Sequence, residues 1–451
     1  MKKATSIILL SLSVAASLAA QTPAQASQTP GSPATSGIAD VLESPALEIN
    51  KGLPSWLIFG GDYRSRFEGY SGGSYKPNTA DDYLLSRLKL RLTIRPTSWM
   101  KFFIEGMDAR ALEKTPAVPT YQNTWDIRQA YGEIGDFEKG IFGLRVGRQE
   151  FVYGDERLIG PSAWSNTERN FDAIRGTARY KGYRLDIFAS SIVMPVTGTW
   201  DHHLQGNNLH GAYGGIDKLG PRLVIEPYAM WRLQHGVKNE ENVVSRLNEK
   251  IGGLRIVGHQ LPGGFDYGME AVREFGSLGS DKIQTWAGHW VVGRTTNIRF
   301  TPRVYAEYNY AGGDQKPTDG IRGTFDQLYP SGHDKLGFDD QVGWKNIKDL
   351  RMGLETKPRK NVTAVFEYNN WYLASATDAL YNSAGTAVFR SIAGTAGTHV
   401  GQEFDVTGTW TFAKAFTTGA GVGHILPGQF LKAVTPGNPY TYPYMMIVYK
   451  F

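Results

Sequence analysis

The sequence predicts an all-β protein, a transmembrane antiparallel β-barrel of about 18 strands with long extracellular loops and short periplasmic turns. Three observations predict it: an N-terminal export signal, a two-residue alternation of apolar and polar side chains, and an even number of candidate strands. The 451 residues include no cysteine, which excludes disulfide scaffolds, thiolate metal sites and cysteine nucleophiles.

The N-terminus has the order of a secretory signal peptide. Lys2 and Lys3 precede an apolar stretch from Ile7 to Ala16, and small residues follow as far as Ala26. A membrane anchor is the alternative, but the stretch is short for a spanning helix of about 20 residues. We therefore expect three parts: a removed signal peptide (1–26), a flexible periplasmic segment rich in Pro, Ala, Ser and Thr (27–55), and the barrel (56–451).

The charge is nearly balanced. Without Lys2 and Lys3 the chain has 46 basic and 43 acidic residues, and both kinds are spread along it. A nucleic-acid-binding protein has a large basic excess, so we expect no nucleic-acid partner.

Apolar and polar side chains alternate most clearly along residues 86–96. On a strand, successive side chains point to opposite faces. One face here carries Arg87, Lys89, Arg91, Thr93 and Arg95, and the other carries Leu88, Leu90, Leu92 and Ile94. A soluble sheet could show the same alternation, but strand lengths near the ~9–11 residues of membrane barrels favour a barrel. Because a cation facing lipid costs about 2–4 kcal/mol near the midplane, we expect the charged face to line the lumen.

The alternation recurs along residues 172–181, 297–310 and 401–412, the second of which would place Arg299 and Thr301 on a strand. The candidate strands are 56–70, 82–95, 99–110, 124–135, 139–150, 170–181, 182–192, 208–218, 221–234, 247–260, 263–275, 281–293, 296–311, 346–357, 360–374, 399–412, 415–426 and 439–451. Short connections alternate with long ones, the long ones being 71–81, 111–123, 151–169, 193–207, 235–246, 312–345 and 375–398. This asymmetry is typical of bacterial outer-membrane barrels.

The faces assigned to the lumen carry charges of both signs. The basic pore-lining candidates are Arg64, Arg87, Lys89, Arg91, Arg95, Arg128, Arg145, Arg148, Arg175, Arg179, Arg303 and Arg351. The acidic ones are Glu105, Glu226, Glu307, Glu355, Glu403 and Asp405. Rings of Arg and Lys are typical of anion pores, although part of this set could serve as structural ion pairs.

The connection after residue 150 is dense in charged and aromatic residues. Its candidates for a constriction are Asp155, Arg157, Trp164, Asn166, Arg169 and Asp172. A solvated extracellular loop is one interpretation. A loop folded inward that narrows the pore is the other, and we favour it because Trp164 and Phe171 would otherwise be exposed.

Motifs for catalysis or cofactors are missing. The sequence has no G-x-S-x-G, H-E-x-x-H or Walker motif, so we expect neither an enzyme nor a cofactor. Asp334, Asp339 and Asp340 could bind calcium, but they lack the EF-hand spacing, and we interpret them as a loop turn with no metal. We expect His202 and His203 to be solvated.

The C-terminal segment ends in an alternating pattern that closes on an aromatic residue. Phe451, Tyr449 and Ile447 occupy alternate positions of the last strand. They resemble the insertion signal of outer-membrane barrels, so we expect the barrel-assembly machinery and outer-membrane lipid as partners.

Three groups of motifs resemble the alginate export family. The first comprises GRQ (147–149), YGD (153–155), GP (160–161), WSNT (164–167) and FD (171–172). The second comprises FDQLYP (325–330), GHDK (332–335), Gly337 and QVGWKNI (341–347), and the third runs from GH (423–424) through PG (427–428) and FL (430–431) to YKF (449–451). The resemblance implies an eighteen-stranded outer-membrane barrel that carries an anionic polysaccharide through an arginine-rich lumen, served by periplasmic export partners.

Three functions stay open at this point. The first is export of an anionic, alginate-like polysaccharide through the Gram-negative outer membrane. The second is an uptake porin for small anions or acidic oligosaccharides. The third is a barrel enzyme or adhesin acting through the loops 312–345 and 375–398.

Overall fold

The computed structural model describes residues 46–115, 118–217, 219, 222–413 and 415–451. The signal peptide expected at 1–26 and most of the segment expected at 27–55 lie outside these residues. No helix in the described ranges is long and apolar enough to cross a membrane.

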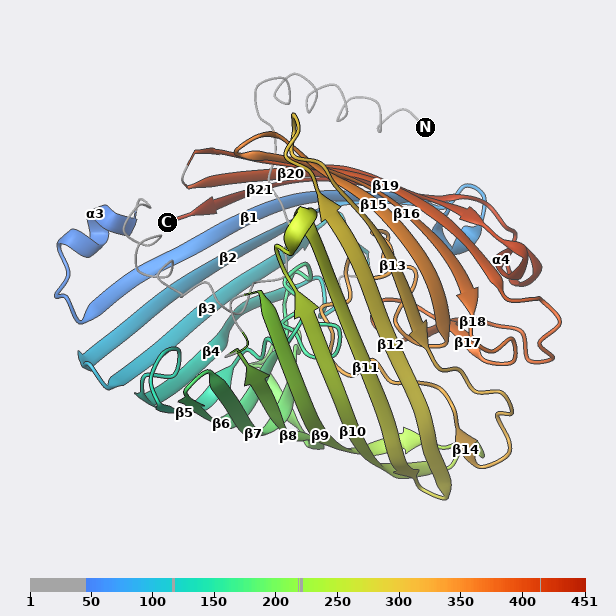
Figure 1. Ribbon diagram of the computed structural model, residues 1–451, viewed down its shortest axis with the longest axis horizontal. Helices are drawn as coiled ribbons and strands as arrows, with labels where there is room; N and C mark the ends of the chain where they lie inside the picture. Colours follow the sequence, from blue (N-terminus) through green and yellow to red (C-terminus); the bar gives the residue numbers. More distant parts are fainter. Residues whose placement is uncertain (1–45, 116–117, 218, 220–221, 414) are drawn as a thin grey trace.

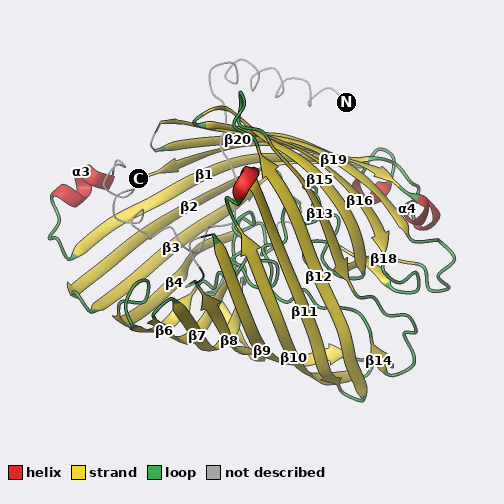
Figure 2. Cartoon of the chain, viewed as in Figure 1, coloured by secondary structure: helices red, strands yellow, loops and turns green. Residues whose placement is uncertain are grey.

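Strands make up nearly all of the described structure (Figure 1, Figure 2). The wall consists of β1 (Leu57–Ser71), β2 (Ala80–Thr97), β3 (Met100–Leu112), β4 (Asn123–Gly135), β5 (Phe142–Gln149), β6 (Asn170–Tyr180), β7 (Tyr183–Met194), β8 (His202–Ile216), β9 (Leu223–Lys238), β10 (Val244–Gly258), β11 (Phe265–Leu278), β12 (Asp281–Thr295), β13 (Arg303–Ala311), β15 (Ile347–Arg359), β16 (Val362–Leu373), β19 (His399–Ala413), β20 (Phe416–Pro427) and β21 (Tyr440–Lys450). The other elements are α3 (Ala46–Lys51), η1 (Gly73–Tyr75), η2 (Pro262–Gly264), β14 (Ile321–Arg322), β17 (Ala379–Tyr381), β18 (Ala387–Arg390) and α4 (Gln429–Val434).

The wall is a closed antiparallel barrel. The sheet has 19 members, but the two-residue β14 only adds to the side of β12, so 18 strands form the ring. The ring closes where β1 pairs with β21, with Tyr63 opposite Tyr449 and Ser65 opposite Ile447. Closure leaves no unpaired strand edge, the condition for a sheet to cross a membrane. The predicted fold class and strand number are confirmed.

The alternation of side chains gives the wall an apolar outside and a polar inside. On β15, Leu350 and Met352 are 41% and 48% exposed, whereas Asp349 and Arg351, which alternate with them, are 0% and 8% exposed. Exposed apolar side chains on the outer face suit contact with lipid.

The two ends of the barrel differ in their connections. Short turns, such as Lys181-Gly182 between β6 and β7, lie at the end that also holds α3 and the C-terminus, while α4, β17 and β18 lie at the other (Figure 1). One connection at the long-loop end is short, since only Gly279 and Ser280 separate β11 from β12.

The start of β13 is the largest error in the predicted boundaries. The strand was expected from residue 296, but residues 296–302 form a turn in which Thr296 N–H donates to the Pro302 carbonyl. Phe300 and Thr301 have positive φ angles of 69° and 40°, which a strand does not allow. Arg299 and Thr301 are therefore not strand residues. β8 begins earlier than predicted, at His202, so both histidines lie on a strand, where they are exposed as expected.

Two long connections fold into the bore. We call residues 150–169 the β5–β6 loop and residues 312–346 the β13–β15 loop. Their apolar side chains, including Ile159, Phe325 and Leu336, belong to a buried cluster with inward residues of the strands. The lumen therefore contains a packed apolar core.

Candidate functional site in the barrel lumen

The β5–β6 loop crosses the full bore. At one end, Glu168 contacts Arg128 on β4; at the other, Arg157 donates to Glu307 on β13 at 2.7 Å. These two strands face each other, because eight wall strands separate them on either side of the ring. The predicted inward course of this loop agrees with these contacts.

The two inward loops are bonded to each other. Tyr329 N–H donates to the Leu158 carbonyl at 2.8 Å, and Gly160 N–H donates to the Tyr329 carbonyl at 2.9 Å. Arg169 donates to the Pro330 carbonyl at 2.8 Å. The loops thus form one unit inside the barrel.

Glu168 is the main ionic anchor of this unit. Its carboxylate lies 2.5 Å from Arg87 Nη1 and 2.6 Å from Lys89 Nζ, and it also contacts Arg128. Burial raises the pKa of Glu168, but these three cations outweigh burial and hold it well below its usual range. Glu168 therefore stays ionised at neutral pH.

Two further loop carboxylates pair with basic side chains of the wall in the same manner. Asp155 of the β5–β6 loop pairs with Arg255 on β10, and Asp326 of the β13–β15 loop lies 3.0 Å from Arg232 on β9. Burial raises the pKa of each carboxyl, and the paired arginine is the first of the charges that bring it below its usual value. Carboxylates of the loops thus pair with basic side chains of the wall.

The Trp164 ring contacts Arg66 and His333. The Arg66 guanidinium lies 3.9 Å from the centre of its ring, and the His333 ring stacks on it at 3.9 Å. Arg66 donates to the Trp164 carbonyl at 2.6 Å, and Arg64 donates to the Ala163 carbonyl at 3.0 Å. Asn166 donates to backbone carbonyls of β2 and β3 and fixes the same stretch.

Most predicted basic residues lie in ion pairs. Those with a carboxylate within 4.0 Å are Arg87, Lys89, Arg91, Arg128, Arg145, Arg148, Arg175, Arg303 and Arg351. Within the described ranges, Arg64, Arg95 and Arg179 have no carboxylate partner. Arg64 is buried, and Arg95 is exposed near the end of β2.

The predicted acidic residues fall into two groups. Glu105 pairs with Arg128 at 2.5 Å, Glu226 with Arg255 at 2.6 Å, and Glu355 with Lys357 at 3.2 Å. Glu307 belongs with them through Arg157. Glu403 and Asp405 are different, because neither has a basic partner within 4.0 Å among the described residues. Asp172 lies on β6, not in the loop, where it pairs with Arg148 at 2.9 Å.

A cavity of about 720 Å³ extends from the inward loops to the turns at the short-turn end. Basic and acidic side chains both line it; the charged residues of the lining are Asp155, Glu156, Arg157, Arg255, Asp266, Arg303, Glu307, Asp334, Lys335, Arg351, Glu355, Lys357 and Glu367. The lining is therefore mixed in charge.

Sequence reasoning missed several of these residues. Arg255 alternates with Leu254 and Ile256, so the rule applied to β2 would have found it. Asp326 and Arg66 gave weaker signals: the first lies in a loop, and the second stands beside Arg64 in a strand of mixed pattern.

The comparison with protein families decides the relationship of the chain. The sequence profile of the alginate export family matches residues 55–440. The chain belongs to the alginate export family. No curated protein matches its sequence.

Solved structures of Pseudomonas aeruginosa porins share the architecture. OccK5 (OpdH) aligns with a TM-score of 0.61 at 10% identity, over 88% of this chain and 98% of that protein. OpdK crystallised with vanillate aligns with a TM-score of 0.60 at 9% identity, over 87% and 98%. OccK8 (OprE) aligns with a TM-score of 0.59 at 10% identity, over 88% and 98%. At this identity the likeness concerns the fold, and together with the family it describes a porin-like outer-membrane barrel.

Proposed function

We propose that this member of the alginate export family is an outer-membrane channel for anionic, uronate-rich polysaccharide. The observation that carries the proposal is the seating of loop carboxylates on wall cations, with Glu168 on Arg87, Lys89 and Arg128. A uronate carries the same carboxylate group. Where such a loop carboxylate leaves, a carboxylate of the polymer can take its place.

This exchange explains how the polymer would move. A conducting pore must bind its solute weakly and at several sites. Because each new contact replaces an existing one, the net gain in free energy is small, and the cations on β2, β4, β9 and β10 offer successive positions. Arg64 and Arg95, which lack a carboxylate partner, would add a fixed positive potential. The constriction is the β5–β6 loop, with Asp155, Arg157, Trp164, Asn166 and Arg169.

Conduction of small anions is a second candidate. The 720 Å³ cavity favours it, since small-molecule sites span about 300–1,000 Å³. The direction of transport would depend on concentration gradients or periplasmic partners in either case.

Current through single channels tests the proposal. The refolded protein is placed in a planar bilayer with a salt gradient, and uronate oligomers or neutral oligosaccharides of equal length are added. We expect an anion-selective current that only the uronates block, with weaker block in an Arg87→Ala/Arg91→Ala variant. A current that neither sugar blocks would favour the small-anion channel. Absence of current from a folded barrel would contradict both and favour a loop-based adhesin or enzyme.

Assembly in the outer membrane is part of the same proposal. The Phe451 ring lies 5.6 Å from Tyr449 and 6.2 Å from Phe59 of β1, so the terminal aromatic packs at the seam where the barrel closes. We expect the barrel-assembly machinery to recognise Phe451, Tyr449 and Ile447, after export by the signal peptide. Deletion of Phe451 should lower the amount of folded protein in the outer membrane.

A further inference from the structure

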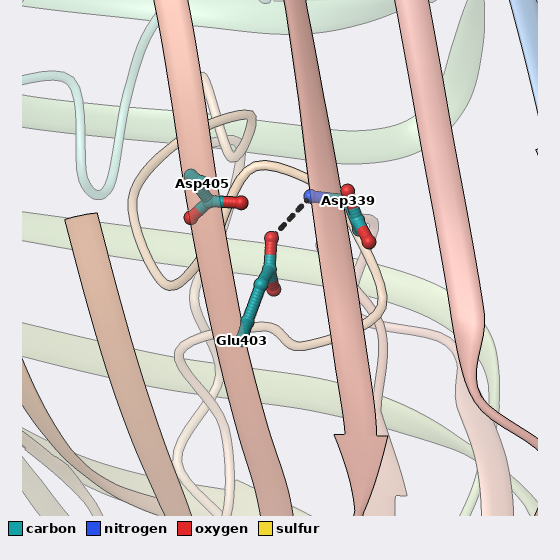
Figure 3. Close-up of side chains that lie close together, drawn as sticks. All are labelled: Asp339, Glu403 and Asp405. Atoms are coloured by element: carbon teal, nitrogen blue, oxygen red, sulfur yellow. Dashed lines mark hydrogen bonds between the residues drawn. The ribbon is translucent and has the colours of Figure 1, made fainter. Parts of the chain in front are cut away.

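Three acidic side chains meet behind the β13–β15 loop (Figure 3). Asp339 comes from the loop, and Glu403 and Asp405 point inward from β19. They are 2%, 0% and 3% exposed, and one carboxylate oxygen from each lies within 4.8 Å of the others.

These carboxylates lack the partners that buried anions need. Glu403 accepts the backbone N–H groups of Phe338 at 2.6 Å and Asp339 at 2.8 Å through one oxygen, Oε1. Its Oε2, both oxygens of Asp339 and Oδ1 of Asp405 have no donor among the described residues. Buried anions require a cation or hydrogen bonds to compensate for lost hydration.

A buried amide side chain, Asn369, contacts one of the three acids. Asn369, on β16 opposite Glu403, is 0% exposed and donates from Nδ2 to Asp405 at 3.3 Å. Its carbonyl oxygen Oδ1 has no partner in the described structure. Carboxylate and amide oxygens are the ligand types that calcium prefers.

Two glycines leave room for these oxygens. A Cβ at Gly423 would lie 1.8 Å from Asp339 Oδ1 and 2.8 Å from Asp405 Oδ1, so both unpaired oxygens converge over that glycine. A Cβ at Gly337 would lie 2.2 Å from Glu403 Oε2. Side chains at either position would fill the space that the carboxylates occupy.

We propose that Asp339, Glu403, Asp405 and Asn369 bind one calcium ion. Calcium–oxygen distances are about 2.3–2.6 Å, so opposite ligands lie roughly 4.6–5.2 Å apart, whereas magnesium at about 2.0–2.1 Å needs a tighter cage. The three carboxylate oxygens lie within 4.8 Å of one another, so a single calcium ion can reach all three. The site contains no histidine or cysteine, which separates it from typical zinc sites.

The ion would fasten the β13–β15 loop to the wall. Asp339 is the only one of the four ligands that comes from the loop, so the calcium links the inward unit to β19. The proposal departs from the expectation of no metal. It uses Asp339 but neither Asp334, which pairs with Lys335 at 3.1 Å, nor Asp340, which pairs with His333 at 2.9 Å.

Terbium luminescence tests the site without any transport assay. Terbium replaces calcium and emits when excited through a nearby indole, and Trp371 provides one, since a Cβ at Gly337 would lie 2.6 Å from its ring and 2.2 Å from Glu403. The full refolded chain is stripped with EDTA and titrated with terbium, and calcium is then added as a competitor. We expect one saturable signal that calcium reverses, and loss of that signal in Trp371→Phe.

Isosteric variants assign the ligands. We expect Glu403→Gln and Asp405→Asn to weaken calcium competition at least about tenfold, because affinity follows the number of charged ligands. Asp334→Asn, in the same loop but outside the site, should bind like the parent. A gel-shift assay of heated and unheated samples verifies that each barrel is folded. Two results would overturn the proposal: no terbium signal from the folded parent, as when the acids only share protons, or unchanged competition in both ligand variants.

Discussion

Replacing Glu168 with Gln should release the β5–β6 loop from the wall. The substitution keeps the shape of the side chain but removes its charge, which leaves Lys89 without its carboxylate partner; Arg87 keeps bonds to backbone carbonyls of the loop. Arg128 keeps Glu105 at 2.5 Å. Lys89 therefore loses its partner, whereas Arg87 and Arg128 each keep another one.

The expected size of the effect follows from burial. The Lys89 and Glu168 side chains are 8% and 2% exposed. Breaking a buried pair by neutralising one partner costs about 3–5 kcal/mol, and about 1.4 kcal/mol is a factor of ten. The ratio of docked to undocked loop should fall roughly a hundred- to several-thousand-fold.

Single-channel recording measures the release. We expect Glu168→Gln to conduct more current and to be blocked at lower uronate concentrations, because the vacated cations become available to the oligomer. Adding Lys89→Met should restore docking, since no buried charge is then left unpaired. Glu138→Gln is the matched control: Glu138 also pairs with a wall arginine, Arg145 at 3.1 Å, but is 56% exposed, so its loss should have little effect. Conductance and block equal to those of the parent would refute the anchoring role of Glu168.

Three further predictions concern the outer face, a loop and the fixed charge. Leu350→Arg should destabilise the barrel in vesicles by about 2–4 kcal/mol, measured by urea unfolding monitored through tryptophan fluorescence, because Leu350 faces lipid; an unchanged midpoint would place this face away from lipid. Burial, with Asp126 nearby, raises the pKa of Asp201 to about 6 from 3.8, so its share of the stability is complete below about 3.8 and is lost as the pH rises through about 6; Asp201→Asn should flatten the stability profile in that window, and an unchanged slope would contradict this. Arg64→Gln should reduce anion selectivity in reversal-potential measurements more than Arg95→Gln, and the reverse order would locate the selective charge at the rim.

The wall could be predicted from the sequence because its signals are local. Side chains alternate every two residues, and a charge on the outward face costs free energy in lipid. The strands β2 and β15 can therefore be recognised from their own residues. The start of β13 was missed because Phe300 and Thr301 continue the alternation of the strand while their backbone turns.

The pairing inside the bore could not be predicted in the same way. Arg157 reaches Glu307, and Asp339 reaches Glu403, across long stretches of sequence. Such contacts depend on the path of a loop through the lumen, for which alternation gives no information. Composition indicated only that a loop rich in aromatic residues would avoid water.

The position of the closing seam has a consequence for assembly. β21, the last strand of the chain, must find β1, the first, before the ring is complete. In the finished barrel, Arg64 and Arg66 on β1 are bonded to the β5–β6 loop. That loop can hold the first strand in its final orientation from inside the nascent barrel. We therefore expect that shortening the loop slows ring closure even where the finished pore tolerates the loss.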